Sequence, residues 1–264
     1  MGVDYSIGFG CVPKERMTTD GIIRRLKAGE RAASILEFYR QNNDQRAIDH
    51  MGGEVTLRTA NGETETRTVL VKDLLAEHAE LDVLAPYCED CPANRFAKPF
   101  GCIGRISYPI SAQVELWMLY QLPSPEEPLP YLLLSKAEEM GLTGATARQY
   151  RDQEGVIFQN PDTMGREYPE MKITADQLFE LLFMLGSIQP KRAVMILMYL
   201  NAIRRDMEAS ELMALTPTPS DAAEKYPFQI SISPDDDYST RDFKQFLYTL
   251  HLAWLLGREV ILDV

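Results

Sequence analysis

Four cysteines are the residues of this chain whose chemistry and spacing point to a site. Cys88 and Cys91 form a C-x-x-C pair, and Cys102 follows within the loop-rich stretch YCEDCPANRFAKPFGCIG, residues 87–104. Cys11 is distant in the sequence, but it stands in the same Phe-Gly-Cys setting as Cys102. Two thiolates at C-x-x-C spacing can reach one ion, and tetrahedral zinc takes four such ligands. The sequence therefore predicts a structural zinc site made of Cys11, Cys88, Cys91 and Cys102.

Three other interpretations of the cysteines stay open. An iron–sulfur cluster is the runner-up, because Pro92 follows Cys91 as in ferredoxin loops, although the dense ferredoxin run of cysteines is missing. A redox-active pair should open a helix, and Cys88 lies too far ahead of Pro92 for that. Unrelated thiols packed as small hydrophobic residues are the fourth interpretation. A structural rather than catalytic metal is favoured because four sulfur ligands leave no position for water.

The composition is that of a globular chain with a strong negative charge. The 264 residues include 27 Lys and Arg against 39 Asp and Glu, a net charge of −12. Such a surface repels phosphate, which argues against a nucleic-acid partner. The chain opens with no basic and apolar leader, and charged residues and Pro190 interrupt its most apolar stretch, 178–203. We therefore expect a cytoplasmic protein with reduced thiols and no membrane span.

Hydrophobic periodicity predicts an α+β fold with a mixed or antiparallel sheet and about seven helices. The clearest local signal is EVTLRTANGETETRTVLV, which predicts a peripheral β-hairpin over 54–71 with Asn61 and Gly62 as its turn. This turn would set Arg58 opposite Glu65.

Prolines divide the chain into two predicted lobes. The Pro-rich connection 123–130 separates an N-terminal lobe, 1–122, which carries the hairpin and the cysteines, from a helical C-terminal lobe, 131–264. A single core shared by both lobes is the alternative. The second lobe is expected to end in a strand–helix–strand unit with a parallel crossover, formed by FQISIS, DFKQFLYTLHLAWLLG and EVILDV.

The function expected from these features is protein binding or assembly. The predicted helix 191–205 is apolar nearly all round, which is typical either of a core helix or of an interface with a protein partner or a second copy. An iron–sulfur redox or sensor protein is an alternative. Another is an enzyme that uses the Asp235–Asp237 loop as cation ligands or His251 as a base, although helix capping and core packing would also explain these residues. No catalytic motif is recognised.

One basic stretch stands out in this acidic chain. RRLKAGER, residues 24–31, carries four basic side chains and one glycine. It could meet an anion or form the solvated face of a helix.

Overall fold

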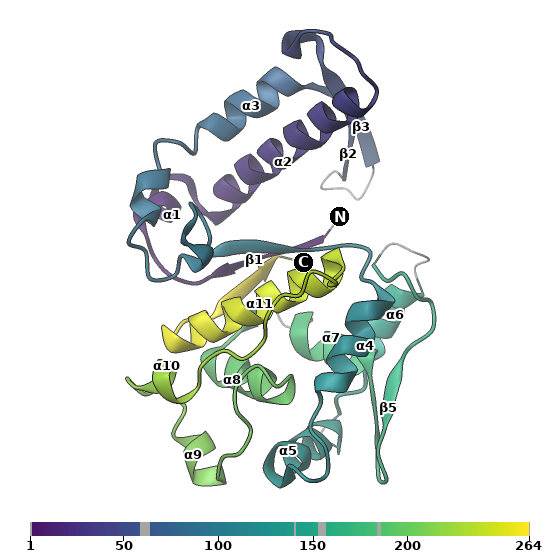
Figure 1. Ribbon diagram of the computed structural model, residues 1–264, viewed down its shortest axis with the longest axis vertical. Helices are drawn as coiled ribbons and strands as arrows, with labels where there is room; N and C mark the ends of the chain where they lie inside the picture. Colours follow the sequence, from purple (N-terminus) through teal and green to yellow (C-terminus); the bar gives the residue numbers. More distant parts are fainter. Residues whose placement is uncertain (1, 59–63, 140, 153–156, 184–185, 264) are drawn as a thin grey trace. The chain divides into compact units, whose positions relative to one another are not determined.

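The computed structural model describes the whole chain except residues 1, 59–63, 140, 153–156, 184–185 and 264 (Figure 1). The described residues form eleven α-helices and eight strands, and every pair of neighbouring strands is antiparallel. The predicted α+β class is confirmed. The helices outnumber the seven expected because several are too short for their periodicity to show, namely α1 (Val12–Met17), α6 (Ala145–Arg151), α9 (Ala209–Met213) and α10 (Ala222–Lys225).

The chain divides into two compact units. The large unit consists of Met1–Phe9 and Gly101–Val264, and the small unit of Gly10–Phe100. This division differs from the predicted lobes, since the Pro-rich stretch 123–130 lies inside the large unit. There Pro128 begins α5 (Pro128–Glu139), a position at which proline suits a helix.

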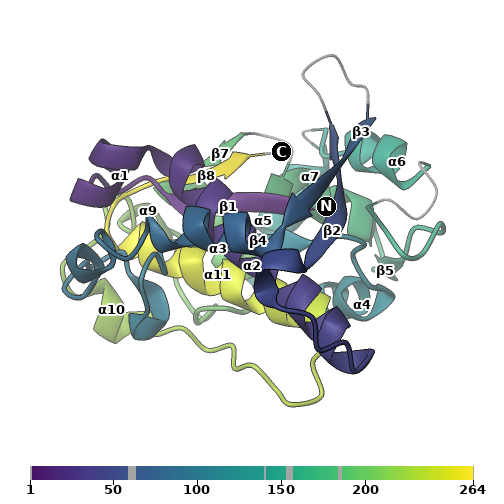
Figure 2. The same ribbon diagram turned by 90° about the horizontal axis from the view of Figure 1, so that it is seen from above.

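The large unit is built on a four-stranded sheet. Its order is β4 (Ile103–Ser107), β1 (Gly2–Ile7), β8 (Val260–Asp263) and β7 (Ser187–Ile188), and Figure 2 shows β8 between β1 and β7. The long helix α11 (Tyr238–Leu255) packs against the sheet, where Phe246 meets Tyr5 with 4.9 Å between ring centroids. The unit is completed by α4 (Ala112–Gln121), α7 (Ala175–Phe183), α8 (Pro190–Tyr199) and the hairpin β5 (Gly165–Glu167) and β6 (Lys172–Thr174).

The apolar helix expected over 191–205 is α8, a core helix of the large unit. It packs against α11, and the side chains of Ile196, Leu197 and Met198 are fully buried. These three buried side chains are unavailable to a partner. None of the helices described here is both long and apolar enough to cross a membrane.

The predicted strand–helix–strand end of the chain is only partly correct. The helix and the last strand are α11 and β8, but FQISIS (residues 228–233) forms no strand, and β8 pairs antiparallel with β1. The segment is held to its neighbours instead. The amide of Gln229 donates to the carbonyl of Ala202 (2.9 Å), Lys244 donates to the carbonyl of Ser231 (3.0 Å), and Phe228 packs on Tyr248.

The small unit is a helical hairpin with a β-hairpin. Its long helix α2 (Thr19–Gln41) packs beside α3 (Val71–Ala79), as Figure 1 shows. Two tight 3₁₀ turns, Ala85–Cys88 and Arg95–Ala97, follow α3, and a third, Ile48–His50, precedes the strands. The core cluster combines Ala28, Ala32, Met51, Val71 and Leu74.

The predicted β-hairpin is present, with its register shifted by one residue. Strands β2 (Gly52–Arg58) and β3 (Thr64–Leu70) pair Arg58 with Thr64 and Leu57 with Glu65. The expected pairing of Arg58 with Glu65 is therefore wrong. Asn61 and Gly62, the predicted turn, lie outside the described residues.

Candidate metal centre

Cys11 stands where the first helix of the small unit begins. It is the residue before α1, its backbone is extended (φ −155°, ψ 161°), and a proline lies in the first turn of the helix. Its side chain makes no capping hydrogen bond to the helix and is half-buried. The thiol is thus not used to cap the helix that it precedes.

Cys88 and Cys91 lie on one tight turn. Cys88 ends the 3₁₀ turn Ala85–Cys88, and the amide of Cys91 donates to the carbonyl of Cys88 at 3.4 Å. Asn94 closes the loop, because its backbone amide donates to the carbonyl of Cys91 (2.9 Å) and its side-chain amide to the carbonyl of Cys88 (2.7 Å). These bonds fix the backbone that carries both thiols.

The two segments that carry Cys11 and the C-x-x-C pair pack against each other. Helix α1 lies against the turn before Cys88, and the Arg16 guanidinium stacks over the Tyr87 ring, 5.2 Å from its centroid. Burial raises the pKa of the Cys88 thiol, and the charges of Cys91 and Cys11 raise it further. The contact between α1 and the turn before Cys88 therefore places the segments of Cys11 and Cys88 side by side in the small unit.

The loop after the C-x-x-C pair is strained and hydrogen-bonded to sulfur. The amide of Phe100 donates to the Sγ of Cys88 at 3.4 Å, which favours the thiolate and opposes the effect of burial on its pKa. Phe96, Ala97 and Phe100 all adopt positive φ (62°, 47° and 57°). Such conformations cost about 1–3 kcal/mol per residue and persist only where surrounding contacts enforce them. The loop is therefore a shaped element rather than a passive connection.

The fourth predicted ligand, Cys102, belongs to the large unit. It is buried just before β4, and its carbonyl accepts the amide of Ile7 at 3.0 Å. All four cysteines are free thiols. Over the described part of the chain, no three His, Cys, Asp or Glu side chains are grouped as the ligands of a metal ion.

Two carboxylates of the Asp235–Asp237 loop make structural interactions. Asp236 is buried, and each of its two carboxylate oxygens accepts a hydrogen bond from Lys244 Nζ at 2.8 Å. Asp237 caps α11, accepting the amide of Thr240 at 2.7 Å. Asp235 is exposed. The carboxylates thus act in a buried ion pair and a helix cap, which does not favour a cation site here.

His251 is a buried hydrogen-bonded residue of the large unit. Its Nε2 lies 2.8 Å from the carbonyl of Tyr226, and its ring packs between Phe228 and Trp254. Burial lowers the pKa of His251, against the effect of this hydrogen bond. The residue therefore packs as a neutral side chain.

A buried ion cluster in the large unit was not foreseen. Arg151 donates to Glu115 (2.8 Å) and to Asp176 (2.8 Å), and all three side chains are almost completely buried. Burial raises the pKa of Glu115, although Arg151 opposes it. The three residues come from α4, α6 and α7, so the cluster ties three helices together. The one signal in the sequence was a glutamate inside the apolar stretch VELWML.

Comparisons with known proteins give no relative for this chain. No family model matches it, and neither a curated protein nor a solved structure does. The case for function therefore rests on the residues themselves.

Proposed function

We propose that this is a metal-stabilised binding protein, in which zinc held by Cys11, Cys88, Cys91 and Cys102 ties α1 to the loop of residues 85–100. What supports the proposal is the packing of α1, which begins directly after Cys11, against the turn that ends at Cys88. Cys102 is the fourth ligand by its sequence setting. Four reduced thiols suit a compartment such as the cytoplasm.

Zinc binding requires a closer arrangement of the sulfurs. Each ligand must come to about 2.3 Å from a common ion. The loop that carries Cys88 and Cys91 consists of 3₁₀ and other turns rather than regular helix or strand, so its local backbone sets where the two thiols lie. The role of such a metal is to shape the loop, because an all-sulfur shell has no open position for chemistry.

The loop also offers a surface for a protein partner. Val83, Tyr87 and Phe96, close to the C-x-x-C pair in sequence, are 73%, 46% and 48% exposed. Single exposed apolar residues are normal, but several near one shaped loop are typical of an interaction site. We place the partner at this loop rather than at α8, whose apolar residues are buried.

Metal analysis of the purified protein tests the site. We expect one equivalent of zinc in the wild type and a marked loss in Cys11→Ser, Cys91→Ser and Cys102→Ser. The control is Ala93→Ser, which adds a hydroxyl in the same loop and leaves every sulfur in place; it should keep its zinc. Full zinc in both Cys11→Ser and Cys102→Ser would disprove the four-thiolate site. Iron with inorganic sulfide in place of zinc would support the iron–sulfur alternative.

Site-specific photo-crosslinking in cells tests the binding surface. A crosslinker at Val83 or Phe96 should give protein adducts, whether with another protein or with a second copy. The matched control is Phe38 on α2, which is 63% exposed and far from the cysteines in sequence. Equal adducts at all three positions would show that the loop has no special role.

A further inference from the structure

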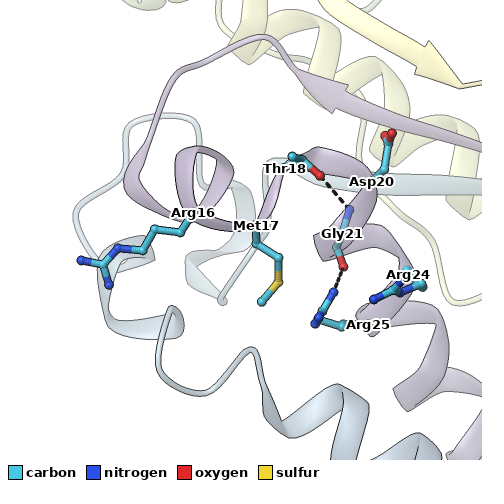
Figure 3. Close-up of a pocket in the computed structure, with 7 residues that line it drawn as sticks. All are labelled: Arg16, Met17, Thr18, Asp20, Gly21, Arg24 and Arg25. Atoms are coloured by element: carbon cyan, nitrogen blue, oxygen red, sulfur yellow. Dashed lines mark hydrogen bonds between the residues drawn. The ribbon is translucent and has the colours of Figure 1, made fainter.

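A cavity of about 540 Å³ opens in the small unit where α1 meets α2 (Figure 3). Its walls contain three arginines, in a chain whose net charge is −12. Two of them, Arg24 and Arg25, come from the basic stretch 24–31, so part of that stretch lines a cavity. The lining residues are Arg16, Met17, Thr18, Asp20, Gly21, Arg24 and Arg25.

The three arginines differ in how far they are already engaged. Arg25 is committed, because it donates to Glu80 through Nε (2.8 Å) and Nη2 and to the carbonyl of Gly21 through Nη1 (3.1 Å). Arg24 is 67% exposed and forms an ion pair with Glu77, with 2.8 Å between Nε and Oε1. Arg16 stacks on Tyr87 and forms no ion pair with any carboxylate of the described residues.

The positive charge available to a ligand comes from Arg16 and Arg24. An exposed ion pair such as Arg24–Glu77 is worth little, so a ligand can compete for it. The amide of Gly21 already donates a hydrogen bond to the Thr18 hydroxyl (3.2 Å), so the backbone amides at the start of α2 are not the main groups that would bind an anion. Asp20 projects to the opposite side of Gly21 from Arg25 (Figure 3).

We infer that this cavity binds the phosphate or pyrophosphate group of a small soluble molecule. Guanidinium groups match phosphate oxygens in bidentate geometry and keep their charge at any physiological pH. Figure 3 shows Arg16 and Arg24 at opposite ends of the set of lining residues, with the Arg16 side chain extending away from the others. The volume is within the range of small-molecule sites and exceeds what one phosphate needs, which leaves room for an organic remainder.

Calorimetric titration with inorganic pyrophosphate at low ionic strength tests the site. Arg24→Gln and Arg16→Gln should each weaken binding about tenfold, since each removes charge-assisted hydrogen bonds. Glu77→Gln should strengthen binding about threefold, because it releases Arg24 from its ion pair. A gain of affinity is a result that damage to the fold would not produce.

A matched control separates the cavity from general charge. Arg40→Gln removes the same charge from the same helix, at a side chain that is 78% exposed and paired with Glu37, and should leave affinity unchanged. The inference fails if pyrophosphate gives no binding, if Arg40→Gln has the same effect as Arg24→Gln, or if citrate binds as tightly as pyrophosphate. The inference does not depend on the metal site, and Arg24→Gln should keep the metal content of the wild type.

Discussion

The two units of this protein are held together by different means. The large unit has a core of big aromatic side chains, and those fully buried include Phe179, Phe243, Phe246 and Trp254. A core cluster of the small unit combines Ala28, Ala32, Met51, Val71 and Leu74, with Ile35, Leu36, Tyr39 and Val69 packed against it. Smaller side chains bury less apolar area and contribute less free energy. The unit with the weaker core is also the one that carries three of the four cysteines, where a metal would add most.

The units also differ in charge. The small unit has 13 Lys and Arg against 15 Asp and Glu, and the large unit has 14 against 24. The excess of negative charge therefore belongs almost entirely to the large unit. The net negative charge therefore disfavours anionic ligands at the large unit and not at the small one, where the arginine cavity lies.

Removing the metal should produce the largest difference in stability between the two units. Zinc contributes about 10–16 kcal/mol in small domains that depend on it. We therefore expect a chelator to speed hydrogen–deuterium exchange throughout Gly10–Phe100 and above all in residues 85–100, while exchange in α8 and α11 stays slow. Peptide-resolved mass spectrometry measures this directly. Equal acceleration in both units, or none in the small unit, would contradict the proposed role of the metal.

Breaking the buried ion cluster should act on the other unit. Arg151→Met leaves Glu115 and Asp176 buried without their cation, and removal of one partner from such a pair costs about 3–5 kcal/mol. Chemical denaturation should show this loss with unchanged metal content. Lys172→Met is the control, because it removes a cation from an exposed pair with Glu167 in the same unit and should cost less than about 1 kcal/mol. A comparable loss in both variants would show that burial of the cluster is unimportant.

Local signals predicted much of the fold. The β-hairpin, α11 and the last strand follow from alternation, capping and periodicity in short stretches of sequence. FQISIS has the alternation of a strand, but its backbone forms hydrogen bonds with Ala202 and with Lys244 of α11 instead of with a neighbouring strand. Nothing in the local sequence reveals those contacts. The two compact units are also invisible to local signals, because β1 pairs with β4 and β8 from beyond residue 100.

The candidate sites were also predictable only where a short motif marks them. The C-x-x-C pair is visible as a motif, and Cys11 could be added because Phe-Gly-Cys occurs twice and the chain has no fifth cysteine. The Glu115–Arg151–Asp176 cluster could not be predicted, since its members lie in three helices and no motif joins them. The arginine cavity was visible only as a basic stretch, because Arg16 joins it through the packing of α1.

A smaller effect is expected where α2 and α3 touch in the small unit. A Cβ on Gly29 would lie 2.6 Å from Nδ1 of His78, the atom that bonds the carbonyl of Arg25 at 3.0 Å. Gly29→Ala should gain up to about 1 kcal/mol from helix propensity but lose about 1–3 kcal/mol from overpacking, for a net loss of about 1 kcal/mol. Gly10→Ala meets nothing within 4 Å and should be neutral or slightly stabilising in the same denaturation experiment. A stabilised Gly29→Ala would show that the two helices can separate freely.

The smallest effect concerns pH and again distinguishes the units. Burial lowers the pKa of His251 below its ordinary value of 6.5, so the unfolded chain binds the proton more readily than the folded one. The stability that comes from the neutral ring is complete above about pH 6.5 and is lost as the pH falls below it. Unfolding free energies measured from pH 7 to 5 should therefore fall less steeply in His251→Gln than in the wild type. His50→Gln, at an exposed histidine of the small unit, is the matched substitution for comparison. An unchanged slope in His251→Gln would mean that protonation of this ring is not what weakens the large unit in acid.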